Sequence, residues 1–291
     1  MTLITYDKLK SPIFLLSLLL STSCSVSNID IKPSNENIEY LIEQGKALWE
    51  QRADSTALTR ASHVIGLAFN ERPFDLELVS LYSQIQHAIA YFHDIDIAKK
   101  DSIFLHASHI CKNIVLKHPD FLASYQTGTG DSTIQLLKTI SEAPKSLVPI
   151  LYWWAVNLGH YLNNQPVMER LNHRELMEVI MNRVLALEPT LYYSGPYRFF
   201  GMLYTRIPGI DLSQSETYFK QSYLASPEYL GNSVFMAEYY HQKSGNREQF
   251  NLLLNTVLSF DLNSQPELIS HNFLFQEKAR NLLENESSLF E

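Results

Sequence analysis

The sequence lacks the features from which most catalytic and metal sites are built. Its 291 residues include only two cysteines, Cys24 and Cys111, which is too few for a disulfide framework or a zinc site. It has no HExxH or GxSxG motif, and the glycines of residues 128–130 lack the Gly-Lys-Ser/Thr ending of a phosphate loop. His106 and His109 are three residues apart, but no pattern supplies the further ligands that a metal needs. We therefore expect no catalytic residues, no metal site and no cofactor.

Positive charge is also in short supply. The chain has 23 Lys and Arg against 31 Asp and Glu, a formal net charge of −8, so it would repel a phosphate backbone. With 10 Gly and 12 Pro, the sequence is neither fibrous nor disordered, and 45% hydrophobic residues are enough for a large core. We expect a globular protein that does not bind nucleic acid.

The first residues read as an export signal. Lys8 and Lys10 precede an apolar run from Ile13 to Leu20, which is too short to span a membrane as a helix. Small residues then lead to Cys24, as in a bacterial lipoprotein processing site. In this interpretation residues 1–23 are a lipoprotein signal peptide, and Cys24 becomes the acylated N-terminus, anchored through its lipid. Residues 24–34 form a tether, and the absence of an acidic residue after Cys24 favours the outer membrane. The alternative is a simple secretion signal with an incidental cysteine.

Residues 35–291 are predicted to form one all-α domain, because apolar residues recur at spacings of three and four. Asp131, Ser213 and Asn246 are candidate N-caps. The expected helices are residues 36–51, 55–70, 75–93, 97–117, 132–141, 146–163, 170–187, 192–205, 213–225, 228–243, 246–260 and 266–285.

Four of these helices end in a similar way at a proline. The prolines are Pro73, Pro119, Pro189 and Pro227. Before three of them, small residues flank a larger one at constant offsets: Ala61, Ile65 and Ala68; Ala107, Cys111 and Ile114; Ser215, Phe219 and Ser222. This is the pattern of the second helix of a tetratricopeptide-like hairpin, and Gly45, Gly159 and Gly201 lie where the paired helix would cross. The sequence predicts a tetratricopeptide-like helical-hairpin solenoid of about twelve helices, whose inner face is free to bind another molecule.

Two predicted helices carry clusters of aromatic residues. Consecutive residues of a helix point about 100° apart, so three aromatics in a row cannot all enter one core face. Either one of them lines a groove, a pore or an interface, or the helix is buried on all sides. The candidate ligand- or partner-binding residues are Tyr152, Trp153 and Trp154 on the first helix, and Tyr197, Arg198 and Tyr204 on the second.

Three segments, in this order and after the lipoprotein processing site at Cys24, resemble the T-component of TRAP transporters. They are residues 151–160 (LYWWAVNLGH), residues 195–209 (GPYRFFGMLYTRIPG) and the stretch from Ala237 to Phe290. The resemblance covers about residues 35–290. It implies a periplasm-facing lipoprotein of the bacterial envelope that forms a homotrimer and binds the solute-binding subunit of the transporter. It also implies a pore in each protomer through which a hydrophobic ligand passes.

Two functions from different classes remain open at this point. The first is the TRAP accessory protein that the resemblance implies, and the second is a general cell-envelope scaffold for protein complexes without a ligand. A cavity lined by apolar and aromatic side chains would favour the first. A cleft with converging polar groups of perturbed pKa would instead favour an enzyme.

Overall fold

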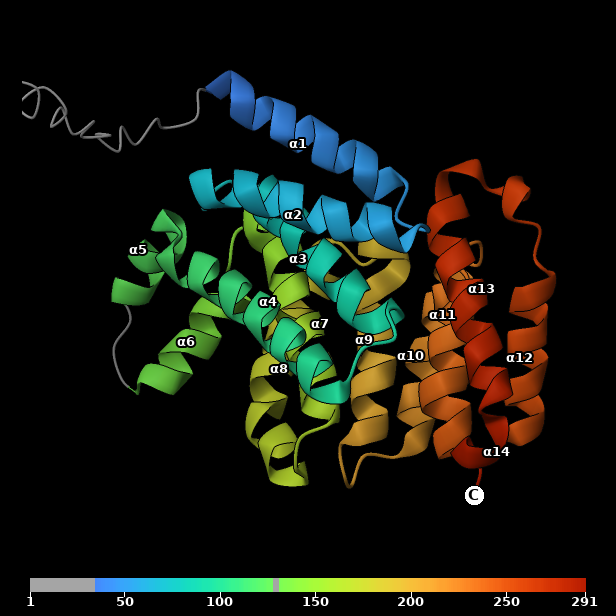
Figure 1. Cartoon of the computed structure of the whole chain (residues 1–291). Helices are drawn as coiled ribbons and strands as arrows, with labels where there is room; N and C mark the ends of the chain where they lie inside the picture. The colour runs from blue at the N-terminus through green and yellow to red at the C-terminus, as the bar shows by residue number, and fades with distance from the viewer. Residues whose placement is uncertain (1–34, 128–130) are drawn as a thin grey trace, which may run out of the picture.

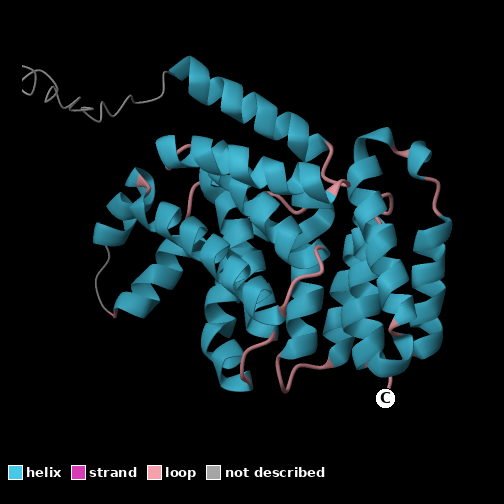
Figure 2. Ribbon diagram, viewed as in Figure 1, coloured by secondary structure: helices cyan, strands magenta, loops and turns pink. Residues whose placement is uncertain are grey.

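The computed structural model describes residues 35–127 and 131–291. In these two ranges all the regular secondary structure is helical (Figures 1 and 2). The α-helices are α1 (Asn35–Glu50), α2 (Ser55–Glu71), α3 (Leu76–Phe92), α4 (Ile97–Lys117), α5 (Pro119–Thr127), α6 (Ser132–Ser141), α7 (Val148–Asn163), α8 (Val167–Leu187), α9 (Leu191–Arg206), α10 (Leu212–Ala225), α11 (Gly231–Phe235), α12 (Arg247–Ser259), α13 (Ile269–Glu284) and α14 (Glu286–Leu289). The all-α class is confirmed, with fourteen α-helices in the described residues where about twelve were predicted. The predictions for Cys24, the tether and the loop at residues 128–130 lie outside the described ranges.

Local sequence signals fix where many of the helices begin. The carboxylate of Asp131 accepts hydrogen bonds from Thr133 N (2.8 Å) and Ile134 N (3.2 Å), so Asp131 caps α6 as predicted. Asn246 caps α12 in the same way. The prediction for Ser213 was wrong, because the cap of α10 is Asp211, whose side chain accepts from the Ser213 amide at 2.8 Å.

The prolines end the helices as predicted. Helices α2, α4, α8 and α10 each end two residues before Pro73, Pro119, Pro189 and Pro227. Proline disfavours the helical conformation of the residue before it, which explains the common distance. Pro119 also begins the short helix α5, which was not predicted, because its fixed φ suits the first position of a helix.

The small residues let helices of a hairpin approach closely. A Cβ at Gly45 of α1 would collide with the side chain of Ile65 on α2, and a Cβ at Gly201 of α9 would lie 2.8 Å from the ring of Phe219 on α10. The predicted close crossings in these two hairpins are therefore present. Gly159 of α7 differs, because its close neighbours are Phe199 and Met202 of α9, and not the paired helix α8.

Two of the predicted helices are less regular than expected. Residues 228–243 contain the short helix α11 followed by a π-helical segment, Met236–His241. The helix predicted over residues 266–285 begins as a 3₁₀ turn, Pro266–Leu268, before α13. Both regions lie beside the cavity described below.

The first hairpin contacts the last long helix. Figure 1 shows the turn between α1 and α2 next to α13, and two hydrogen bonds join them. Ser270 Oγ donates to the Glu50 carbonyl (2.6 Å), and Arg52 Nη2 lies 2.6 Å from His271 Nδ1. This contact brings the two parts of the chain together around an interior space, and α7 forms part of its wall.

Candidate functional site

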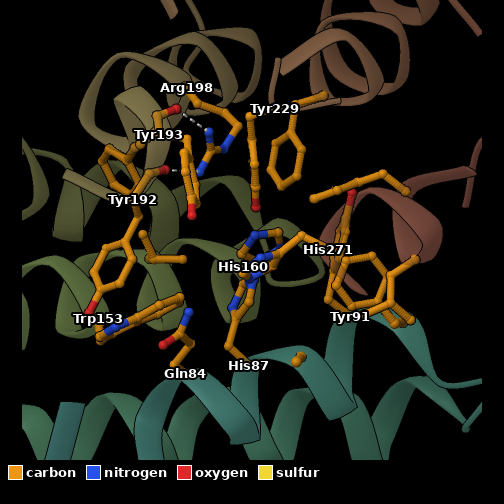
Figure 3. A pocket seen from close by; sticks show the side chains of 18 of the residues that line it. Gln84, His87, Tyr91, Trp153, His160, Tyr192, Tyr193, Arg198, Tyr229 and His271 are labelled. Carbon is orange, nitrogen blue, oxygen red and sulfur yellow. Dashed lines mark hydrogen bonds between the residues drawn. The ribbon is translucent and has the colours of Figure 1, made fainter. Parts of the chain in front are cut away.

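The enclosed space is a narrow cavity lined by α1, α3, α7, α9, α11, α13 and the turns beside them. Its volume is about 60 Å³, and the space between the lining atoms amounts to about 730 Å³ when the open region at the mouth is included. Half of the lining residues are aromatic: Trp49, Tyr91, Phe92, Tyr152, Trp153, Tyr192, Tyr193, Phe199, Tyr229, Phe235 and Phe275. The others are Arg52, Gln84, His87, Ala88, Val156, His160, Gly195, Arg198, Met202, His271 and Leu274. Figure 3 shows how the labelled members of this set lie around the cavity.

An unusual backbone turn places two tyrosines in the wall. Tyr192, Tyr193 and Ser194, at the start of α9, have φ values of 46°, 57° and 62°. This left-handed conformation costs roughly 1–2 kcal/mol for each residue with a Cβ, so the surrounding structure must hold it. The Arg198 guanidinium does so by donating to the carbonyls of Tyr192 and Tyr193, both at 3.1 Å.

Asn232 stabilises this turn through hydrogen bonds. Its Oδ1 accepts hydrogen bonds from Arg198 Nη1 (2.6 Å) and Ser222 Oγ (2.7 Å), and its Nδ2 donates to the Ser226 carbonyl (2.9 Å). Asn232 is fully buried, and Ser222 also donates to the Ser194 carbonyl at 3.1 Å. The pattern of small residues on α10 thus serves the cavity as well as the hairpin.

Arg198 is a buried cation surrounded by neutral groups. Its side chain lies over the rings of Tyr229 (4.9 Å) and Phe235 (5.5 Å), both of which line the cavity. These cation–π contacts and the carbonyl partners stabilise the guanidinium. Within the described ranges Arg198 forms no ion pair with a carboxylate.

Three histidines in the cavity wall are held in the neutral form. Burial, followed by the charges of Lys278 and Arg198, lowers the pKa of His160 to about 3. Burial, followed by the charges of Arg52 and Arg198, lowers the pKa of His271 to about 3. The pKa of His87 is also well below its ordinary value, through burial and the neighbouring His160. At neutral pH the imidazoles therefore act as polar but uncharged wall groups.

One wall ends in a satisfied polar cluster. The Tyr91 hydroxyl donates to Glu238 Oε2 at 2.6 Å, and Lys278 Nζ pairs with Glu238 Oε1 at 2.9 Å while it lies over the Tyr91 ring. Burial, followed by the charge of Glu238, raises the pKa of the Tyr91 hydroxyl well above its usual range. Tyr91 therefore presents a neutral aromatic surface to the cavity.

This arrangement suits binding more than catalysis. Binding pockets are mostly apolar with a few oriented polar groups, which describes this cavity. Cys111 lies outside the lining, where burial raises its pKa to about 12 and Ser83 Oγ lies 3.1 Å from its sulfur. A thiol in that state is a poor nucleophile. The described residues contain no group of three or more His, Cys, Asp or Glu side chains that could hold a metal ion.

The structure brings together three of the six aromatic-helix residues singled out from the sequence. Tyr152, Trp153 and Arg198 line the cavity. Trp154 is 1% exposed and lies in the core, and Tyr204 packs against Phe200 and Tyr218 on another face of α9. Tyr197 also faces Tyr218, so neither Tyr197 nor Tyr204 is part of the cavity. Whether any of the six binds a ligand stays a prediction.

Sequence reasoning missed most of the cavity wall. Tyr192 and Tyr193 were assigned to a regular helix, and no role was predicted for His87, His160 or His271. His87, His160 and His271 lie on three different helices, so no spacing within the sequence indicates that they meet. The adjacent tyrosines before Gly195-Pro196 were the one local signal of an interrupted helix.

Comparison with known proteins identifies one family. The family model for the TRAP transporter T-component matches residues 94–290, more than half of the chain. No curated protein matches the sequence. The matched segment contributes α7, α9, α11 and α13 to the cavity, whereas α1, α2 and α3 precede it.

Proposed function

The chain belongs to the TRAP transporter T-component family, and from this membership we propose a specific role for its cavity. An accessory role in a TRAP transporter, and with it a place in the bacterial envelope, follows from the family alone. Our proposal is that the protein binds the solute-binding subunit of the transporter and passes a ligand with an apolar body through the cavity. The observation that carries this proposal is the aromatic cavity that the first hairpin, α13 and the helices between them line.

The lining supports an elongated apolar ligand. Aromatic rings and the side chains of Val156, Met202 and Leu274 form most of its wall. Burying apolar surface yields roughly 25 cal/mol per Å², so each apolar group of a ligand that enters the cavity would add to its affinity. A scaffold without a ligand has no use for such a cavity, and this favours the transport function over the scaffold alternative.

A groove at the surface supports a route into the cavity. It lies between α1, α3 and the start of α7, and it is lined by residues that include Lys46, Leu81 and Pro149. Trp49, Gln84 and Tyr192 line both the groove and the cavity. We propose that these three side chains form the passage between the two.

The position in the envelope is part of the proposal. No helix in the described ranges is long and apolar enough to cross a membrane. We propose that the lipid on Cys24 holds the protein on a membrane, facing the periplasm, and that three copies associate. Sedimentation of the purified protein should then give three times the mass of one processed chain, and a monomer at micromolar concentration would contradict the trimer.

The docking step is tested by co-purification. The full chain, tagged at its C-terminus, should retain the solute-binding subunit from the same transporter under mild conditions. The solute-binding subunit of an unrelated TRAP transporter is the matched control and should not be retained. Retention of neither subunit would favour the general scaffold.

A further inference from the structure

The charges in the cavity wall do not balance. Two arginines, Arg52 and Arg198, line the cavity, and no Asp or Glu is among the lining residues. Buried charges in proteins are normally paired, because the cost of removing an ion from water is several kcal/mol. A wall with two cations and no anion calls for an explanation beyond its apolar content.

Arg198 is available to a ligand through its charge, because its hydrogen-bond donors already have partners. Its Nη atoms already donate to the Tyr192 and Tyr193 carbonyls and to Asn232. These partners are neutral, so the positive charge stays uncompensated. After burial, the same charge contributes to the lowered pKa of all three cavity histidines.

Arg52 has a hydrogen bond to spare. Its Nη1 donates to the Trp49 carbonyl (2.8 Å) and its Nη2 to His271 Nδ1 (2.6 Å), but the buried Nε–H has no partner. The side chain is 3% exposed, and among the described residues the carboxylate that pairs with it is that of Glu50, which is 3.5 Å away and 73% exposed. Solvent screens a carboxylate so exposed. Burial lowers the pKa of Arg52, because the charged guanidinium is removed from water.

His271 adds a second unused donor. Because an arginine can only donate, His271 Nδ1 must be the acceptor in its contact with Arg52, which places the imidazole proton on Nε2. No hydrogen bond from this Nε2 is found in the described part of the chain. Arg52 Nε and His271 Nε2 are thus two donors without a hydrogen-bond partner among the described residues, on two lining residues that contact each other, and the charge of Arg198 acts on His271 as well.

From these observations we infer that the Arg52–His271 end of the cavity is an anion-binding subsite, which takes the carboxylate of a ligand whose apolar body lies among the aromatic rings. The inference rests on the proposed ligand function and narrows it, from any apolar molecule to an amphipathic organic anion. Arg52 belongs to the first hairpin, outside the segment that the family model matches. The subsite is therefore built by the contact between the α1–α2 turn and α13.

The nearby acidic cluster does not compete for this role. Glu238 lies outside the lining and is already satisfied by Tyr91 and Lys278. A cationic ligand would face two arginines without a carboxylate in the wall. The arrangement selects negative charge.

Two probes that share one skeleton test the inference. 4-Phenylbutyrate carries a carboxylate at pH 7, and 4-phenyl-1-butanol carries a hydroxyl on the same phenylalkyl chain. Titration calorimetry with the full-length protein should show that the carboxylate binds about tenfold more tightly or better, the range for a hydrogen bond to a charged group. The Arg52→Gln variant should lose that advantage and bind the alcohol as the unchanged protein does.

Two further variants control the result. Arg60→Gln removes an exposed cation from α2, away from the cavity, and should leave both affinities unchanged. Arg52→Lys keeps the charge but not the Nε–H, and it should retain part of the preference. Unchanged binding of the alcohol shows that each variant is folded.

The outcomes separate the two claims. Equal binding of both probes by the unchanged protein, or an equal loss of both in Arg52→Gln, would overturn the anion subsite and leave an apolar cavity. Binding of neither probe would overturn the subsite together with the ligand part of the proposed function. The docking of the solute-binding subunit is tested separately, by the co-purification experiment.

Discussion

The crossing of α9 and α10 offers a quantitative test of the hairpin packing. In Gly201→Ala, the new Cβ would lie 2.8 Å from three ring atoms of Phe219, which is fully buried. Carbon atoms in contact are about 3.5–4.0 Å apart, so the ring or the helix must retreat by about 0.7 Å or more. Overpacking of this kind costs about 1–3 kcal/mol.

Two smaller effects act in opposite directions. Ser215 Oγ donates to the Gly201 carbonyl at 2.6 Å, and separation of the helices would weaken this bond by up to about 1 kcal/mol. Alanine favours the helix over glycine by about 1 kcal/mol. Together these effects predict that Gly201→Ala lowers the free energy of unfolding by about 1–3 kcal/mol.

The matched control is the same substitution at another helical glycine. In Gly66→Ala the new Cβ would meet only Tyr82 Cε2, at 3.3 Å, so the helical gain should prevail and stability should rise by up to about 1 kcal/mol. Urea unfolding followed by circular dichroism measures both variants. If Gly201→Ala proved as stable as Gly66→Ala, the close crossing at Gly201 would be refuted.

Three other predictions concern the anchor, the core and the histidines. Cys24→Ala should move the protein from the membrane fraction to the soluble periplasmic fraction, and unchanged membrane association would argue against the lipid anchor. Trp154→Ala should destabilise the protein by about 3–5 kcal/mol in urea, because Trp154 is 1% exposed in the core, and a loss below 1 kcal/mol would show that it is not a core residue. The pKa of His160 is about 3 in the folded protein and near 6.5 when exposed, so the unfolded chain gains the proton first. The contribution of His160 to stability should be complete above pH 6.5 and be lost toward pH 3 at up to about 1.4 kcal/mol per pH unit, and His160→Phe should lessen the overall slope by that amount.

The sequence predicted those features of the fold that local chemistry decides. The prolines nearby predict the ends of α2, α4, α8 and α10. The small residues of the hairpin pattern predict the close crossings at Gly45 and Gly201. A misplaced cap, Ser213 for Asp211, reflects two candidate residues within one turn. Such signals act over a few residues and can be recognised without coordinates.

The cavity wall could be predicted only in part, because distant residues build it. The left-handed turn at Tyr192 and Tyr193 is held by Arg198 and Asn232, and the Arg52–His271 contact joins residues 219 positions apart. The helix that carries Tyr152 and Trp153 was predicted correctly. Which of its aromatic side chains enters the cavity depends on the neighbouring helices, which are distant in the sequence. Trp154, one position further along, points into the core.

The most direct test of the account is whether the cavity binds an apolar ligand. Val156 lines the cavity and is 6% exposed, so Val156→Phe should fill the space, whereas Leu252→Phe on the exposed surface of α12 is the matched control. Calorimetric titration with 4-phenyl-1-butanol should give saturable binding to the unchanged protein and to Leu252→Phe, and little or none to Val156→Phe. Equal binding by all three proteins would place the ligand elsewhere and contradict the account.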